Sequence, residues 1–219
     1  MTITWYGQSC FEIIAKNKEG GDTTIVIDPF SEETGLRLPK LTADVLLVSH
    51  AHFDHNNIKA VGGNPFLINS CGEYEIKDAF TRGFFAFHDE QGGKERGRVI
   101  IHKIEIEGIR VCHLSDLGQK ELTSEQLEQI GDVDILMVPV GGKFTIDAKG
   151  ASEIISQIEP RIVVPMHYNL PRSKSNAELD GVDRFLKVMG EEDIAPEKKL
   201  KITAKNLPAE ETKIVVLEP

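Results

Sequence analysis

The chain has 219 residues, of which 40% are hydrophobic and 27% charged; this balance is ordinary for a globular protein and indicates neither disorder nor a fibrous repeat. The formal net charge of −10 argues against tight nonspecific binding to nucleic acid, because that mode of binding needs a basic surface. A chain of this length can bury a core without disulfides, and we expect one domain over residues 1–219.

Two absences in the sequence bear on location and partners. No apolar run approaches the roughly 20 residues that cross a bilayer, and Met1 leads into a strand-like segment rather than a signal peptide. The cysteines Cys10, Cys71 and Cys112 have unrelated spacings and form no CxxC pair, which supports neither a disulfide framework nor a thiolate zinc site. We therefore expect a cytoplasmic protein with no membrane partner and no stable nucleic-acid partner, and leave a homo-oligomer open.

The first part of the chain is predicted to be a meander of strands that leads into a buried strand. Apolar and β-branched residues predict strands at 2–6, 11–15 and 24–27, with a glycine-containing turn between the last two. The apolar run from Val45 to Val48 predicts a buried strand, and residues 56–61 are predicted to form a short helix.

The rest of the chain alternates predicted strands with predicted helices. Further strands are expected at residues 66–68, 84–87, 99–106, 109–114, 134–138, 162–165, 200–203 and 213–217. Helices are expected at residues 123–130, 147–158 and 182–189, the first with Ser124 as its N-cap. Strands in two sets with helices between them predict a layered α/β protein, and periodicity alone leaves the order of the layers open.

A dense group of polar side chains follows the predicted buried strand. His50, His52, Asp54 and His55 are four metal-binding side chains within six residues. Imidazole and carboxylate groups are costly to bury unpaired, so at the end of a strand they need water, a partner or a cation. A transition metal explains the cluster most simply, and the alternative is a solvated polar turn.

The His-x-His-x-Asp-His pattern after a buried strand resembles the metallo-β-lactamase superfamily. Other segments resemble a compact branch of that family, close to the ascorbate-6-phosphate lactonase and YtkL types. These segments are Ile3 to Gly7, Val26 to Phe30, Gly72 to Glu75, His88-Asp89, Gly92-Gly93, Arg96-Gly97, Leu114 to Gly118, Val138 to Gly142 and Pro165 to Tyr168. The resemblance covers nearly the whole chain and implies an α/β fold, the four-layer αββα sandwich, with a metal site at one edge of its two sheets.

The resemblance also implies which residues bind metal. The first ion would be held by His50, His52 and His88, the second by Asp54, His55 and His167, and Asp116 would bridge the two. Imidazole and carboxylate donors suit zinc, and His52 stands where di-iron relatives commonly carry Glu. We therefore expect two Zn²⁺ ions, with Mn²⁺ or Fe²⁺ as alternatives. The competing interpretations are a loop role for His88 and a turn or capping role for Asp116.

Two other histidines are predicted to be structural. His113 lies three residues before Asp116, and an extended chain points those two side chains to opposite faces. We therefore expect His113 to pack or to bond to the backbone. His102 lies within a predicted strand and matches no motif, so a structural role is favoured for it as well.

Three residues near the implied ligands are predicted to support or line the site. Asp28 is expected to accept a hydrogen bond from a ligand imidazole and so to fix its tautomer. Glu73 and Tyr74 are expected to line the site, with a capping or packing role as the alternative.

Two glutamines and three cations bear on the substrate. Gln8 and Gln119 stand where many relatives of this branch have His, which predicts altered turnover without loss of metal. Arg96, Arg172 and Lys174 are candidate cations for an anionic group of the substrate, against the common alternative of solvated surface charges.

These features predict a metal-dependent hydrolase that acts on a small anionic ester, lactone or phosphodiester. The resemblance implies a metal-bridging hydroxide as nucleophile, with Asp54 accepting its proton and passing it to the leaving group. The alternative is a non-catalytic or weakly active metal-binding or partner-binding domain of the same fold, which only Gln8 and Gln119 support. A redox di-iron protein is a third interpretation.

Overall fold

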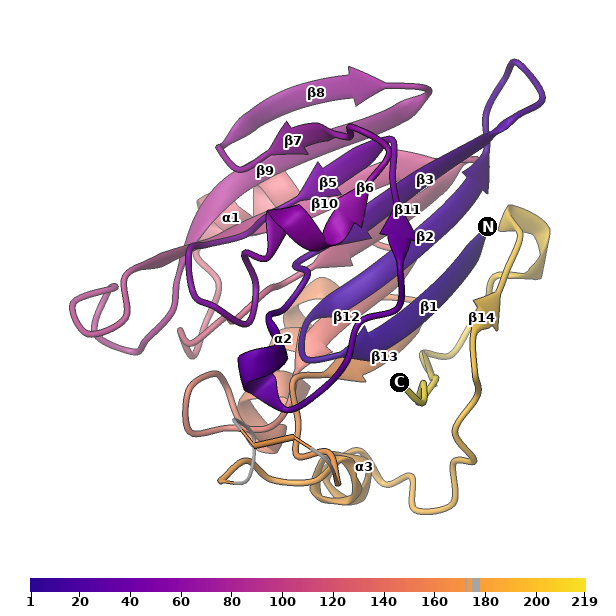
Figure 1. The fold of residues 1–219 in the computed structure, drawn as a ribbon. Coiled ribbons are helices and arrows are strands. Elements are labelled where there is room, and N and C mark those ends of the chain that lie inside the picture. Colours follow the sequence, from indigo (N-terminus) through magenta and orange to yellow (C-terminus); the bar gives the residue numbers. More distant parts are fainter. Residues whose placement is uncertain (172, 175–177) are drawn as a thin grey trace.

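Two β-sheets packed face to face form the centre of the computed structural model, which describes residues 1–171, 173–174 and 178–219. Figure 1 shows the sheets stacked on each other, with helices behind the second sheet. The apolar residues that face inward from both sheets belong to one hydrophobic cluster, which includes Trp5, Phe11, Ile101 and Met137. This shared core holds the two sheets together, because each sheet buries one apolar face against the other.

The first sheet has six strands in the order β14-β1-β2-β3-β5-β7. Their bounds are β1 Thr2–Gly7, β2 Cys10–Lys16, β3 Asp22–Ile27, β5 Val45–Leu47, β7 Phe66–Ile68 and β14 Leu200–Lys201. The meander β14-β1-β2-β3 is antiparallel, whereas β3, β5 and β7 run parallel, with Ile25 opposite Val45 and Leu47 opposite Ile68. Strand β5 is buried throughout, as the apolar run predicts.

The second sheet has seven strands in the order β15-β13-β12-β11-β10-β9-β8. Their bounds are β8 Gly72–Ile76, β9 Ala79–Phe87, β10 Arg98–Ile106, β11 Ile109–His113, β12 Ile135–Pro139, β13 Ile162–Met166 and β15 Lys213–Ile214. Strands β11, β12, β13 and β15 run parallel to one another, and β8 to β11 form an antiparallel meander. Strands β9, β11 and β13 therefore end at the same edge of the sheet.

The outer layers of the two sheets are unlike each other. Helices α1 Ser124–Ile130 and α2 Ala148–Ile158 lie behind the second sheet, and α3 Val182–Met189 packs against α2. The apolar stripe of α2 is buried. The outer face of the first sheet is covered by the chain between β3 and β7. That segment contains the two-stranded ladder of β4 Leu41–Thr42 with β6 Val61–Gly62, and it closes a second small apolar cluster with Leu46.

Most predicted elements are present, with three corrections. Residues 56–61 form only a 3₁₀ turn at Ile58–Ala60 rather than a helix: the Asn57 side chain makes no capping hydrogen bond, and the chain enters β6 at Val61. The N-cap of α1 is Thr123, not Ser124: its hydroxyl accepts a hydrogen bond from the backbone N–H of Gln126, whose side chain bonds back in a capping box. Strand β8 was not predicted at all.

Within the described residues, every helix is too short or too polar to cross a lipid bilayer.

Candidate metal centre

The polar side chains that the sequence singles out follow the carboxyl ends of strands at one edge of the sandwich. His50 to His55 follow β5, and Asp28 follows the adjacent strand β3. His88, Asp116 and His167 follow β9, β11 and β13 of the second sheet. Parallel strand ends share an edge, so segments far apart in the sequence bring their side chains into one site.

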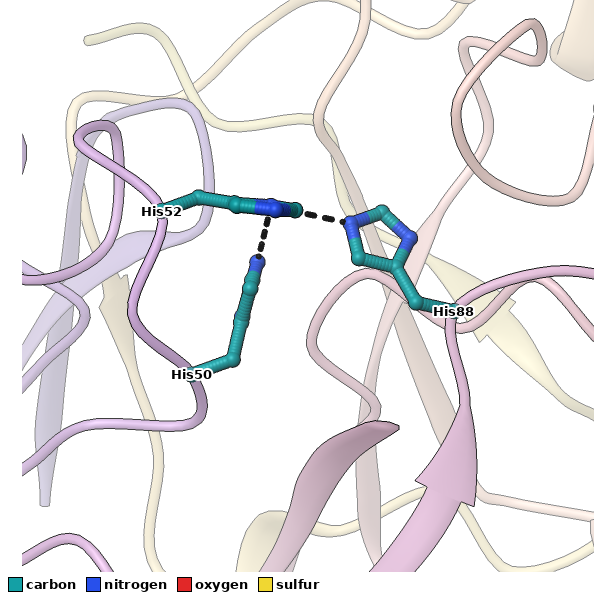
Figure 2. Close-up of side chains that lie close together, drawn as sticks. All are labelled: His50, His52 and His88. Atoms are coloured by element: carbon teal, nitrogen blue, oxygen red, sulfur yellow. Dashed lines mark hydrogen bonds between the residues drawn. The ribbon is translucent and has the colours of Figure 1, made fainter. Parts of the chain in front are cut away.

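Three imidazole rings converge in the first of two groups. The Nδ1 atom of His52 lies 2.9 Å from Nε2 of His50 and 3.3 Å from Nε2 of His88, and Figure 2 shows His52 between the other two rings. His88 is buried, His50 is partly buried and His52 is exposed. Three ring nitrogens directed at one point form a donor set that fits a transition metal.

The second group contains two carboxylates and two imidazoles. The Oδ2 atom of Asp116 lies 3.1 Å from Nε2 of His55 and 3.4 Å from Nε2 of His167. Oδ2 of Asp54 lies 3.6 and 3.7 Å from the same two nitrogens. In this group one ligand atom from each residue lies within 4.8 Å of the others, as is also true of the first group.

Asp116 joins the two groups. Besides its contacts with the second group, its Oδ2 atom lies 3.5 Å from Nε2 of His88 in the first. The carboxylate is buried, and its other oxygen accepts a hydrogen bond from the Ser9 hydroxyl at 3.3 Å. A single carboxylate oxygen is thus directed at both groups.

Unsatisfied buried nitrogens indicate that the site fits a cation. The Nε2 atoms of His55 and His167 are buried and have no hydrogen-bond partner among the described residues, although both face the carboxylates. Buried polar atoms are nearly always satisfied, so each such exception calls for an explanation. A divalent ion between the imidazoles and carboxylates would satisfy these atoms, and the mixed N and O donor set suits it.

The electrostatics of the cluster separate its histidines into two kinds. Burial works to lower the pKa of His55 and of His167, but Asp116 and Asp54 outweigh it and raise both pKa values above the ordinary value. Burial together with neighbouring histidines lowers the pKa of His50 to about 3, and burial is the main cause of the lowered pKa of His88. His50 and His88 are therefore neutral near pH 7, whereas His55 and His167 hold protons that a bound cation would displace.

A buried network fixes the orientation of one imidazole in each group. The Nδ1 atom of His55 donates to Oδ2 of Asp28 at 2.9 Å, and Ser49 donates from its hydroxyl to the same carboxylate oxygen at 2.6 Å. Nδ1 of His50 donates to that Ser49 hydroxyl oxygen at 2.9 Å, and Ser115 donates its hydroxyl to it at 2.6 Å. In both rings Nδ1 then carries a proton. Nε2 of His50 is thus an electron-pair donor directed into the cluster, and Nε2 of His55 becomes one when a cation displaces its proton.

Asp28 is positioned by its place in the fold and ionised by its neighbours. It follows β3 with φ of 44°, and its backbone N–H donates to the carbonyl of Leu47 on β5 at 2.9 Å. Burial raises the pKa of a carboxyl group, but here the facing His55, His113 and His50 lower the pKa of Asp28 to about 2. The expectation that Asp28 bonds a candidate ligand imidazole agrees with this geometry.

Two glycines allow the loops that carry the candidate ligands to approach closely. A side chain at Gly118 would overlap the backbone of His88, and one at Gly141 would overlap the carbonyl of His167. The backbone N–H of Gly118 donates to the carbonyl of Phe87 at 2.9 Å. These close approaches set the distance between the strand ends.

Several predicted site residues lie away from the cluster. Tyr74 bonds Ser70 at 2.8 Å and Glu73 pairs with Arg82, so the structure corrects the expectation that they line the site: strand β8 carries them at the outer edge of the second sheet. Gln119 donates to the carbonyl of Glu121 at 2.7 Å and accepts from the Phe87 N–H at 3.0 Å. Its side chain holds a loop together.

The remaining predicted residues are placed as follows. Gln8 is buried and donates from Nε2 to Oδ2 of Asp54 at 3.3 Å. Arg96 is at the cluster, where it lines the cavity described below. Lys174 is exposed and does not line that cavity, and Arg172 lies outside the described residues.

The structural role predicted for His113 is confirmed. Its Nε2 atom donates to the carbonyl of Ser9 at 2.9 Å, and Nδ1 accepts from the backbone N–H of Ser115 at 3.2 Å. His102 lies opposite it on β10, fully buried, and burial lowers its pKa to about 4. Neither belongs to the two candidate metal groups.

Three serines belong to the site that sequence reasoning did not single out. Ser9 bonds Asp116, while Ser49 and Ser115 belong to the network around Asp28. A serine directly before His50 and one directly before Asp116 were visible in the motifs. A serine adjacent to a ligand carries no signal of its own, because only the fold shows where its hydroxyl points.

A cavity of about 360 Å³ opens over the cluster. It is lined by His52, Phe53, Asp54, His88, Arg96, Asp116, Phe144 and His167. Members of both candidate groups therefore face a space of the size that accepts a small molecule.

Comparison with known proteins relates the whole arrangement to one family. A family model described as a beta-lactamase superfamily domain matches residues 2–167. A UPF0173 metal-dependent hydrolase from Thermoplasma volcanium is 30% identical over 198 residues, which cover 76% of this chain and 83% of the relative. A UPF0173 protein from Pyrococcus furiosus is 31% identical over 192 residues, with 77% and 83% covered.

A solved structure agrees with the fold over the full length. The crystal structure of a candidate Zn-dependent hydrolase of the metallo-beta-lactamase superfamily from Thermotoga maritima matches with a TM-score of 0.77 at 36% identity, covering 99% of this chain and 97% of that one. The chain belongs to the metallo-β-lactamase superfamily. Within it, this protein is a metal-dependent hydrolase, so the predicted family, sandwich fold and enzyme class are confirmed.

Proposed function

We propose that this protein binds two zinc ions and hydrolyses a small anionic ester, lactone or phosphodiester. His50, His52 and His88 would hold one ion, and Asp54, His55 and His167 the other, with Asp116 shared. The observation that carries this proposal is the position of Asp116 Oδ2, within 3.5 Å of nitrogens from both groups. The 219 residues would act as one domain of this fold.

The donor set favours zinc over the alternatives. Five imidazoles and two carboxylates make a nitrogen-rich set, whereas magnesium and calcium prefer oxygen ligands. The Thermotoga maritima relative, described as a candidate Zn-dependent hydrolase, supports the same choice. Manganese and iron remain the alternatives that a metal analysis would distinguish.

When bound, a pair of divalent ions supplies Lewis acidity at the reacting carbonyl or phosphoryl oxygen and lowers the pKa of water. The chain's own contribution is centred on Asp54, which lines the cavity with a side chain 14% exposed. Its pKa is lowered because His55 and His167 outweigh the effect of burial, so its Oδ2 atom is available to accept a proton. Gln8 holds that oxygen in place through its Nε2–H. Asp54 would then return the proton to the leaving group.

The cavity supports a small substrate. About 360 Å³ accommodates a compact organic molecule, at the lower end of the range for ligand sites. Its lining combines the acids and imidazoles of the cluster with Phe53, Phe144 and Arg96.

The test begins with metal content. Protein stripped with a chelator and reloaded should take up two zinc ions per chain and melt at a higher temperature. The reloaded protein, with zinc or with manganese, would then be assayed on a lactone, a 4-nitrophenyl ester and bis(4-nitrophenyl) phosphate. Turnover of at least one class is expected, and Asp54→Asn should lower kcat by about 100-fold or more.

The matched control is Asp22→Asn, which changes an exposed carboxylate paired with Lys16 far from the cluster and should leave kcat unchanged. Failure to bind zinc would contradict the metal proposal. Full occupancy without turnover of any substrate would contradict the proposed substrate classes. The alternative of a non-catalytic domain depends on Gln8 and Gln119. Gln8 contacts Asp54, but Gln119 bonds a loop carbonyl away from the cluster, so half of the support for that alternative is lost.

A further inference from the structure

The loop between β9 and β10 is wrapped around one buried carboxylate. Asp89 accepts four backbone hydrogen bonds, from Gln91 at 2.8 Å, Gly93 at 2.8 Å, Glu95 at 3.0 Å and Arg96 at 2.9 Å. Burial works against its ionisation, but these four N–H groups lower the pKa of Asp89 to about 2. The loop backbone is therefore fixed through an interaction that does not involve the candidate metal ligands.

This loop places a guanidinium group at the cavity. The Cζ atom of Arg96 lies 4.7 Å from the centroid of the Phe144 ring, and both residues line the cavity that contains the cluster. Arg82, Arg110 and Arg184 each pair with a carboxylate, whereas Arg96 forms no ion pair with any residue that the structure describes. Stacking on an aromatic face leaves the N–H groups at the guanidinium edge able to bind a planar or tetrahedral anion.

The cavity also has an exposed apolar wall. Phe53 is 46% exposed although it is a large aromatic residue, and it lies between His52 and Asp54. Its carbonyl accepts from the backbone N–H of Ser31 at 3.0 Å, which ties its loop to the segment after β3. An exposed aromatic side chain within a cavity that also holds a cation is typical of a ligand site, where apolar walls and a few polar groups fix orientation.

We propose that Arg96, stacked on Phe144, binds an anionic group of the substrate, and that Phe53 contacts the apolar body of the same molecule. Asp89 is the positioning residue that holds the Arg96 backbone in place. The inference rests on the proposed function, because it assigns the substrate's anchor in that same cavity. The substrate would be a compact ester, lactone or phosphodiester that carries an anionic group together with a planar or apolar part.

The test uses phenylphosphonate, which joins a tetrahedral anion to a flat ring, and measures its binding to the zinc-loaded protein by calorimetry. Arg96→Gln should weaken binding about tenfold, as expected for the loss of one charge-assisted contact, and Arg96→Lys should restore part of it. Arg98→Gln is the matched control, because Arg98 also stacks on a phenylalanine, Phe85, but does not line the cavity. It should bind like the wild type.

Two further variants test the positioning role of Asp89 and the substrate contact of Phe53, and distinguish both from a general loss of structure. Asp89→Asn should weaken binding while the zinc content stays unchanged, and it should add little to Arg96→Gln in the double variant, because both changes remove the same interaction. Phe53→Ala should reduce the preference for phenylphosphonate over methylphosphonate. Fully additive losses of binding affinity in Asp89→Asn and Arg96→Gln would contradict the positioning role of Asp89. An unchanged preference for phenylphosphonate in Phe53→Ala would contradict the contact between Phe53 and the substrate.

The outcome is independent of turnover. Equal phenylphosphonate affinity in the wild type and in Arg96→Gln, or no binding to the wild type, would overturn the inference even if the enzyme hydrolyses esters. Conversely, the Arg96-dependent binding expected here would stand even if every substrate in the hydrolysis assay were inert. That second result would contradict the proposed reaction alone.

Discussion

Asp28 and His55 form a fully buried pair in which Nδ1 of the imidazole donates to Oδ2 of the carboxylate at 2.9 Å. The same oxygen accepts a hydrogen bond from the Ser49 hydroxyl. The Ser49 oxygen in turn accepts a hydrogen bond from Nδ1 of His50. One carboxylate therefore fixes a histidine in each of the two candidate metal groups. Because its pKa is lowered to about 2, it is ionised at any physiological pH.

The first prediction concerns this carboxylate. Asp28→Asn removes the charge that orients His55 and, through Ser49, His50, and we expect the affinity for zinc to fall about 10- to 100-fold. Competition with a chromophoric chelator measures the change. Asp22→Asn is the control, because Asp22 is exposed at the start of β3, and this variant should bind zinc like the wild type. Equal affinities in both variants would show that the hydrogen bond to His55 does not tune the site.

A second prediction concerns pH. The pKa values of His55 and His167 are raised in the folded, metal-free protein, so protonation of these rings stabilises the fold below the ordinary histidine pKa. This contribution is lost as the pH rises through the raised values. As the pH rises above the ordinary histidine pKa, the deprotonation of these two rings should therefore lower the melting temperature of the metal-free protein.

The zinc-loaded protein provides the comparison for that pH series. Zinc binds neutral imidazole, so its binding should release protons, and its affinity should increase with pH until the two histidines are deprotonated. Calorimetry in buffers of different ionisation enthalpy counts these protons. Zinc binding without proton release near neutral pH would contradict the assignment of raised pKa values.

A third prediction tests the close approach of two loops. Gly118→Ala places a methyl group against the backbone of His88, and the resulting shift should lower the free energy of unfolding by about 1–3 kcal/mol and weaken zinc binding. Gly21→Ala is the control, since a methyl group there meets only the Asn17 side chain at 3.4 Å. Chemical denaturation of both variants gives the comparison. A fully stable Gly118→Ala protein would mean that this approach can relax without cost.

The fourth prediction separates the two glutamines. Gln8→His changes a side chain in contact with Asp54, and we expect it to alter kcat while zinc content is retained. Gln119→His instead removes hydrogen bonds to Glu121, Gln126 and Phe87 and should lower stability without directly changing the reaction. Steady-state kinetics and melting curves of the two variants test this, and unchanged turnover in Gln8→His would refute a role for that position in the reaction.

Local sequence was a good guide where structure depends on local signals. The helix over Val182–Met189 and the strand at Phe66–Ile68 were predicted with their observed bounds, because apolar spacing and nearby glycines mark their ends. Strand β8 escaped prediction because Gly72–Ile76 is short and mostly exposed, and only Tyr74 and Ile76 alternate with charged residues and pack against the core. It forms a strand by pairing with β9, and such pairing cannot be read from one segment alone.

The candidate ligands could be predicted from local sequence only where they lie close together in the chain. His50, His52, Asp54 and His55 are crowded into one motif, whereas His88, Asp116 and His167 are single residues whose assignment came from the resemblance to a family. Their meeting depends on parallel and antiparallel pairings that direct the ends of β9, β11 and β13 to one edge. The serines around Asp28 had no sequence signal.

By itself, the sequence determined the alternation of strands and helices, the buried strand before His50 and the presence of a metal-binding motif, since apolar spacing and residue chemistry are local properties. Only the tertiary structure decided that Asp116 faces both groups, that Gln119 holds a loop and that Arg96 reaches the cavity. These relationships join residues distant in the chain, and they depend on how the sheets pair and pack, which no local pattern encodes.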